Sequence, residues 1–192
     1  MKALVLDGSS ATDARTSAAV DALAARFEAA GAEVERVLVR DLTVHACTGC
    51  FGCWLKTPGE CVIDDDARTV ATRIINSDVM AVVTPVSFGC YGSQMKRLID
   101  RQICLVLPYF KMFDGELHHR LRYSHYPKWL ALGTLPESRP DEEATFKQLV
   151  LRNANNIHDP GHAAQIVVGD ESPNGPINRL FAEAGIATEV LA

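Results

Sequence analysis

The sequence predicts an α/β protein with a doubly wound sheet of five parallel strands. Short apolar segments alternate with amphipathic segments of helical length along the chain. The apolar segments lack polar alternation, which is typical of strands buried on both faces of a parallel sheet. A length of 192 residues with 47% hydrophobic content suits one core. We therefore expect a single domain over residues 1–192, with a cysteine-rich insertion at 45–63 and an irregular loop or lid at 108–127.

The predicted elements follow one another in a βα rhythm. Five strands are expected, over Lys2 to Asp7, Glu33 to Leu42, Val79 to Val86, Trp129 to Gly133 and Ala163 to Val168. Helices are expected through Val20 to a stop at Gly31, from Asp64 through Ile75, through Met95 to Ile99, from Asp141 to Asn156, and from Ile177 to Ala184. Right-handed crossovers favour the strand order 2-1-3-4-5 of the flavodoxin-like fold. Ligands of such sheets bind where the order reverses, beyond the carboxyl ends of strands one and three.

A row of hydroxyl side chains follows the first predicted strand. The loop has one glycine, Gly8, and matches neither a dinucleotide nor a nucleotide-triphosphate motif. Free N–H groups at the start of the next helix, together with hydroxyls and a basic side chain, favour a phosphate. An ordinary N-capping turn is the alternative. The predicted phosphate-binding residues are Ser9, Ser10, Arg15, Thr16 and Ser17.

The loop after the third predicted strand offers backbone groups beside an aromatic side chain. An isoalloxazine ring needs donors along its pyrimidine edge and an apolar surface along its face. One FMN would bridge the two loops, although a plain surface loop is the alternative. The predicted ring-binding residues are Pro85, Val86, Ser87, Phe88, Gly89 and Gly92.

Both loops resemble a known family. The segment TPVSFGCYGSQMKRLIDR is similar to the second flavin loop of the flavodoxin-like NAD(P)H-dependent FMN reductases, and GSSATDARTSAA resembles their first loop, G-S-P-R-x-x-x-N-T. The resemblance implies FMN as cofactor and an oxidoreductase with NAD(P)H or a reduced carrier as donor. Ser10 and Ala11 replace the Pro-Arg pair of the family, and Ser87 replaces its usual Tyr.

Four cysteines have the spacing C-x2-C-x2-C-x7-C: Cys47, Cys50, Cys53 and Cys61. Such spacing can wrap an iron–sulfur cluster. Zinc usually takes two separated C-x2-C arms, a disulfide is disfavoured in a reducing cytosol, and cysteines that are packed or redox-reactive without metal stay an alternative. The pattern resembles the iron–sulfur flavoprotein branch of the family. That resemblance implies a [4Fe-4S] cluster next to FMN.

Charge and composition bound the partners. A net charge of −5 disfavours nucleic acid. Neither a signal peptide nor an apolar run of membrane-spanning length is recognisable, so a cytoplasmic protein without membrane contact is expected. The family resemblance implies a homodimer or homotetramer, in which Tyr109, Phe110 and Tyr123 would cover the flavin of a second subunit. His118, His119 and His125 lack the fixed spacing of metal ligands.

The leading hypothesis is an FMN-dependent electron-transfer protein of the iron–sulfur flavoprotein type, with a small molecule or protein as electron donor or acceptor. A cluster-free NAD(P)H-dependent FMN, quinone or azo-compound reductase is the first alternative. A cysteine-based redox sensor is the second. No side-chain acid or base is predicted, because electron or hydride transfer to FMN needs none.

Overall fold

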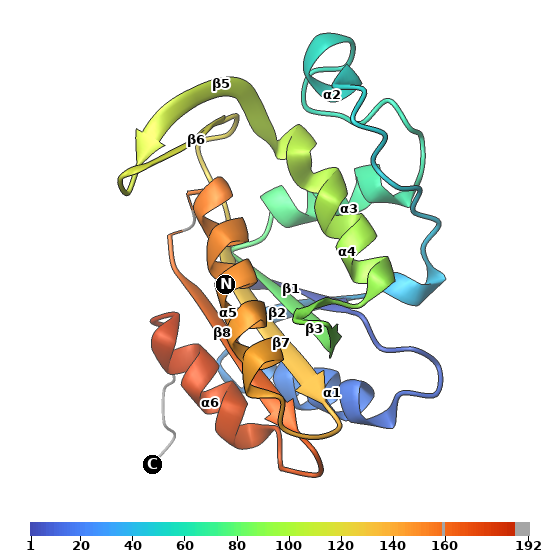
Figure 1. Ribbon diagram of the computed structural model, residues 1–192, viewed down its shortest axis with the longest axis vertical. Helices are drawn as coiled ribbons and strands as arrows, with labels where there is room; N and C mark the ends of the chain where they lie inside the picture. The colour runs from blue at the N-terminus through green and yellow to red at the C-terminus, as the bar shows by residue number, and fades with distance from the viewer. Residues whose placement is uncertain (159, 187–192) are drawn as a thin grey trace.

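The computed structural model describes residues 1–158 and 160–186, and its centre is a parallel sheet of order β2-β1-β3-β7-β8 (Figure 1). The strands of this sheet are β1 (Lys2–Asp7), β2 (Glu33–Leu38), β3 (Val79–Ser87), β7 (Lys128–Leu135) and β8 (His162–Val168). Because β7 and β8 are the fourth and fifth parallel strands, the predicted order 2-1-3-4-5 is confirmed. Its reversal point lies between β1 and β3, which pair from Ala3–Val79 to Asp7–Val83.

Helices cover both faces of the sheet. One face carries α1 (Ala14–Ala29) and α6 (Asn174–Glu183), and the other carries α3 (Asp66–Ile75), α4 (Ser93–Asp100) and α5 (Pro140–Asn156). Alternate side chains of β1 enter opposite cores: Leu4 packs with the second group of helices, and Val5 with the first. Two apolar faces explain why the strand segments show no polar alternation.

Two sequence predictions are corrected by the structure. The second strand ends at Leu38, and a short 3-10 helix, η1 (Val39–Asp41), follows it. The segment 108–127 is not irregular, because β5 (Val106–Phe113) and β6 (Glu116–Leu121) form an antiparallel hairpin that projects from the body (Figure 1). Its turn is Asp114-Gly115, with φ of 49° and 76°. Residues with positive φ at both central positions suit a two-residue hairpin turn.

The cysteine segment leaves the sheet after η1, forms the short helix α2 (Gly52–Leu55), and returns to α3 (Figure 1). A 3-10 helix, η2 (Arg101–Leu105), supports it at the end of α4. The indole Nε1 of Trp54 donates to the carbonyls of Ile103 (3.2 Å) and Val106 (2.9 Å), so Trp54 anchors α2 to this support. Within the described ranges, no helix has the length and apolarity needed to cross a membrane.

Candidate functional site

The first loop starts with a close approach between β1 and β3. The Gly8 amide donates to the Val83 carbonyl at 2.8 Å, and a Cβ atom at position 8 would lie 2.7 Å from that same oxygen. Only glycine therefore fits here without a shift of the backbone. The next residue, Ser9, is buried, and its amide donates to Asp7 Oδ1 at 2.8 Å.

Two arginines that the sequence analysis did not select lie beside this loop. Arg36 pairs with the buried Asp7 at 2.7 Å. Burial opposes the charge of Asp7, but hydrogen bonds from Ser9 and Arg36 outweigh it and lower its pKa. Arg40 Nη1 donates to Ser9 Oγ at 3.0 Å. The fold explains both contacts. Strand β2 lies parallel and next to β1, so Arg36 in β2 and Arg40 directly after it lie beside the end of β1.

The start of α1 is capped by an acidic side chain. Asp13 accepts from the Thr16 amide at 3.0 Å and from the Thr16 hydroxyl at 2.6 Å. The Thr16 hydroxyl is fully buried and also lies 2.6 Å from Oγ1 of Thr134, a residue near the end of β7. Of the other predicted hydroxyls, Ser10 is exposed and Ser17 is half-buried. The exposed Ser10 hydroxyl has only a long contact of 3.5 Å with the Thr12 hydroxyl, whereas the Thr16 hydroxyl is held by two partners at 2.6 Å.

Arg15 points away from the predicted phosphate loop. Its Nε donates to the Gly169 carbonyl at 2.7 Å, and its Nη2 lies 3.8 Å from Asp170. Both partners follow β8 rather than β1. The basic side chain that contacts the Ser9 hydroxyl is therefore Arg40 and not Arg15.

The second loop is a tight hairpin. Strand β4 (Cys90–Tyr91) pairs with the end of β3, and Phe88-Gly89 form the turn with φ of 52° and 72°. The Phe88 side chain is 92% exposed, which leaves an aromatic ring uncovered at the carboxyl edge of the sheet. The Gly89 amide donates to Glu142 Oε2 at 3.2 Å, and the Gly92 amide donates to Thr84 Oγ1 at 3.0 Å. A loop with several free amides was expected, but these two are bound to side chains.

The other predicted ring-binding residues lie along β3. Pro85 is half-buried, Val86 is buried within the core, and Ser87 is exposed at the last position of the strand. Glu142, near the start of α5, joins this hairpin to Arg139 at 3.1 Å, so the loops after β3 and β7 are in contact. The sequence analysis named no residue after the fourth strand, although parallel topology brings that loop to the same edge.

The four predicted cysteine ligands converge on one small cavity. It measures about 30 Å³, and apolar side chains form most of its remaining wall. Burial raises the pKa of the Cys53 thiol, and the neighbouring Cys61, Cys47 and Cys50 raise it further. The cavity is lined by Cys47, Thr48, Gly49, Cys50, Phe51, Cys53, Cys61, Ile63, Arg101 and Ile103. The spacing in the sequence thus identifies four cysteines that line one cavity, with Cys47 and Cys50 exposed, Cys61 half-buried and Cys53 buried.

A fifth cysteine, Cys104, lies in η2 and is buried. Burial raises its pKa to about 11, with further contributions from Cys53 and Cys61. Its thiol donates to the Arg101 carbonyl at 3.4 Å, and it does not line the cysteine cavity. The sixth, Cys90, is half-buried in β4. Neither Cys90 nor Cys104 lines the cysteine cavity.

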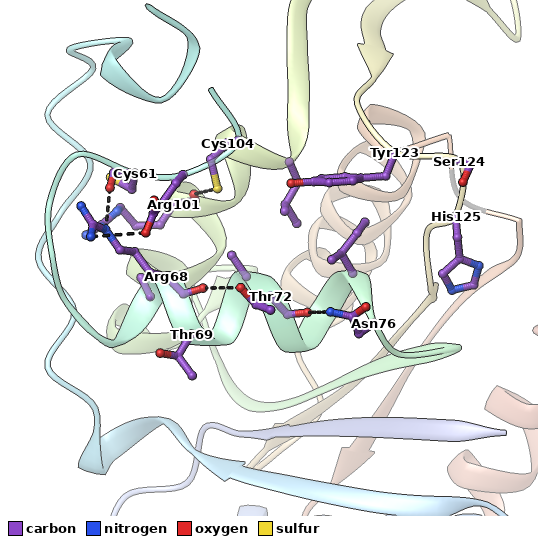
Figure 2. Close-up of a pocket in the computed structure, with 16 residues that line it drawn as sticks. Cys61, Arg68, Thr69, Thr72, Asn76, Arg101, Cys104, Tyr123, Ser124 and His125 are labelled. Atoms are coloured by element: carbon purple, nitrogen blue, oxygen red, sulfur yellow. Dashed lines mark hydrogen bonds and ion pairs between the residues drawn. The ribbon is translucent and has the colours of Figure 1, made fainter. Parts of the chain in front are cut away.

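A larger cavity of about 660 Å³ adjoins Cys61 on the side of α3 (Figure 2). Arg68, Thr72 and Asn76 line it from α3, while Tyr123 lines the opposite wall. Cys61 and Arg101 contribute to both cavities, so a molecule bound here would lie next to the cysteine site.

Comparison with known proteins places this geometry in a family. The model of the NADPH-dependent FMN reductase family matches residues 1–121. The chain belongs to this family. The loops after β1 and β3 and the cysteine segment all lie within the matched residues.

Relatives of this family member include iron–sulfur flavoproteins. One from Methanocaldococcus jannaschii is 30% identical over 173 residues, which are 90% of this chain and 78% of that protein. One from Archaeoglobus fulgidus is 36% identical over 109 residues, which are 57% of this chain and 47% of that protein. The match thus spans about half the length of the Archaeoglobus protein. An NAD(P)H:quinone oxidoreductase from Methanothermobacter marburgensis has the same fold, with a TM-score of 0.69 at 14% identity, covering 94% of this chain and 95% of that one.

Proposed function

We propose that this reductase is an iron–sulfur flavoprotein, which passes electrons between a [4Fe-4S] cluster held by Cys47, Cys50, Cys53 and Cys61 and an FMN at the carboxyl edge of the sheet. The convergence of four cysteines on one cavity is the observation that carries the proposal. Two relatives whose names include iron–sulfur flavoprotein support it.

The residues around the cysteine cavity fit a cluster. Four thiols supply the ligand set of a [4Fe-4S] centre. In the described ranges, no three His, Cys, Asp or Glu side chains are grouped closely enough to hold a single metal ion. The Gly52 amide donates to Cys50 Sγ at 3.5 Å, and with Thr48 it lowers the pKa of that thiol. Phe51, Ile63 and Ile103 give the cavity an apolar wall, whereas Cys47 and Cys50 are exposed.

The edge of the sheet fits FMN in three respects. Gly8 allows a close backbone approach, Ser9 and Ser10 supply hydroxyls, and Arg40 supplies the positive charge that a phosphate requires. The exposed ring of Phe88 gives an apolar surface for the flavin. The Asp13 carboxylate opposes a phosphate at the start of α1. The phosphate is therefore held chiefly by the Ser9, Ser10 and Arg40 side of the loop.

Helix α4 separates the two proposed centres. The β3–β4 hairpin precedes its first residue, and Arg101, on the wall of the cysteine cavity, follows its last. Eight residues of α-helix span about 12 Å. When bound, FMN exchanges hydride or single electrons, and the cluster exchanges single electrons. The residues named above would hold and orient both groups.

The partners we propose are electron donors and acceptors. A small molecule would fit the 660 Å³ cavity beside Cys61, which has the size of ordinary ligand sites. For a homodimer or homotetramer, the β5–β6 hairpin is the contact that the structure favours, because Tyr109, Phe110, Met112 and Leu117 are all more than half exposed on it.

Anaerobic purification followed by iron, sulfide and flavin analysis tests the proposed function. We expect about one FMN and four irons per chain, with an iron–sulfur absorption shoulder that dithionite bleaches. Substituting Cys53→Ser should remove the iron and leave the flavin. Flavin without iron in the wild-type protein would contradict the proposal and leave a cluster-free reductase. Absence of FMN after incubation with excess cofactor would contradict the flavin site.

A further inference from the structure

The Arg101 side chain is enclosed at the end of α4 and holds both ends of the cysteine segment. It is 1% exposed. Its Nη1 donates to Asp65 Oδ2 and to the His45 carbonyl, both at 2.8 Å. Its Nη2 donates to Asp65 Oδ1 at 3.0 Å and to the Ile63 carbonyl at 3.2 Å. Residues 45 and 63–65 are therefore fixed to one guanidinium group.

One donor of this guanidinium has no partner. Arginine has five N–H groups, and the four on the two Nη atoms are accounted for by the contacts above. The fifth, on Nε, is buried and has no hydrogen-bond partner at ordinary distance, and the Cys61 thiol is the further side chain with which the guanidinium interacts. An unpaired buried donor on a charged group destabilises a fold, so its presence indicates a partner that the bound state supplies.

Arg101 forms part of the wall of the cysteine cavity. Figure 2 shows Arg101 beside Cys61 at one end of the adjoining larger cavity, with Cys104 behind it. Burial disfavours the charge of Arg101, but Asp65 and the nearby Cys61 thiol more than compensate and raise its pKa. The guanidinium is therefore cationic, and Asp65 balances its formal charge. The Nε–H group is then the donor of Arg101 that remains available for a ligand of the cavity.

We infer that Arg101 is a positioning residue of the iron–sulfur site whose Nε–H donates a hydrogen bond to a cluster sulfur. The inference rests on the proposed function. Hydrogen bonds to the sulfurs of a cluster stabilise its reduced, more negative form and raise its reduction potential. Arg101 would thus have two effects: its Nη groups set the geometry of the cysteine segment, and its Nε sets the potential.

Arg68 provides a matched control. Arg68 lies in α3 and is a second arginine that binds the cysteine segment, because its Nε donates to the Cys61 carbonyl at 2.7 Å. It does not line the cysteine cavity. The variants Arg101→Lys and Arg68→Lys both retain a positive charge and both lose an Nε donor. Only Arg101 lines the cysteine cavity.

The experiment is an EPR-monitored redox titration of the full-length holoprotein, purified anaerobically, with iron and flavin measured in each sample. We expect Arg101→Lys to lower the equilibrium constant for reduction about tenfold, which for a one-electron couple is about 59 mV. Arg68→Lys should change it less than twofold, with iron and flavin contents unchanged. An Arg101→Lys protein with its cluster and an unchanged potential would overturn the inference.

A second measurement does not depend on the stability of a variant. In wild-type protein carrying ¹⁵N-labelled arginine, pulsed EPR of the reduced cluster should detect a hyperfine coupling to an arginine nitrogen. Absence of that coupling would overturn the inference even if Arg101→Lys fails to retain iron. A wild-type protein without iron would instead overturn the proposed function, and this inference with it.

Discussion

Arg40 and Ser9, separated by 31 residues in the chain, meet through a hydrogen bond of 3.0 Å between Nη1 and Oγ at the carboxyl edge of the sheet. The contact exists because β1 and β2 are parallel neighbours, so the loops that follow them emerge side by side. The family pattern that the first loop resembles has an arginine at the position of Ala11. Arg40, which follows the adjacent strand β2, therefore places a positive charge beside the first loop.

Arg40→Ala should weaken FMN binding about tenfold and leave riboflavin binding unchanged, because riboflavin lacks the phosphate. A charge-assisted hydrogen bond to a phosphate is of that magnitude. Fluorescence titration of the apoprotein with each flavin measures both affinities. Arg73→Ala, an arginine at the surface of α3 paired with Glu35, serves as the control and should change neither. An equal loss of affinity for FMN and riboflavin would place Arg40 away from the phosphate.

Asp13→Asn should strengthen FMN binding a few-fold. Asparagine caps a helix about as well as aspartate, so α1 is retained while a negative charge near the proposed phosphate is removed. The gain should decrease at high salt, because screening weakens exposed charge interactions. Titration at low and high ionic strength checks both points. Weaker binding in the variant would mean that Asp13 does not oppose the phosphate.

Gly8→Ala should destabilise the protein and abolish flavin retention, because the new Cβ would lie 2.7 Å from the Val83 carbonyl oxygen. Overpacking of this kind costs about 1–3 kcal/mol. Gly175→Ala in α6 is the control, since its nearest neighbour is the flexible Arg179 side chain at 3.6 Å. Thermal unfolding of the two variants, followed by far-UV circular dichroism, should separate them. Equal unfolding temperatures would show that the β1–β3 edge can relax.

Asp65 should stabilise the cysteine segment except in strong acid. Burial raises its pKa, but hydrogen bonds from Arg101 and His45 outweigh burial and lower the pKa to about 2. Because the folded pKa lies below the unfolded value of about 3.9, this contribution is complete above about pH 4 and is lost as the pH falls toward 2. At neutral pH, the lowered pKa of Asp65 corresponds to a stabilisation of about 2 kcal/mol. Urea unfolding of wild type and Asp65→Asn at pH 7 and pH 3 measures this contribution. The difference between their free energies of unfolding should be smaller at pH 3 than at pH 7.

Cys61→Ser should release iron, whereas Cys104→Ser should retain it. Cys61 lines the cysteine cavity, and Cys104 does not, although burial and the adjacent thiols raise its pKa to about 11. Iron analysis after anaerobic reconstitution measures the difference, with bound FMN as the internal control for folding. Loss of iron from Cys104→Ser with retained FMN would show that the ligand set differs from the C-x2-C-x2-C-x7-C motif.

The sequence alone determined the order of the sheet and predicted where the two proposed sites lie. Strand order followed from apolar segments in a βα rhythm, because right-handed crossovers leave few alternatives. The four cysteines were identified by spacing, since a short loop brings residues three positions apart to one point. The loops after the first and third strands were located as well, because each follows an apolar strand segment. The close approach at Gly8 and the tight turn at Phe88-Gly89 came from the structure.

Only the tertiary structure decided which side chains complete those sites. Arg40, rather than Arg15, contacts Ser9, and Thr16 is bound to Thr134, 118 positions away. Arg101 closes the cysteine segment from the end of α4 and keeps one donor unpaired. These contacts join residues far apart in the chain, so no local pattern encodes them. They depend on which loops the packed sheet brings to one edge, and on which hydrogen-bond donors the fold leaves unused.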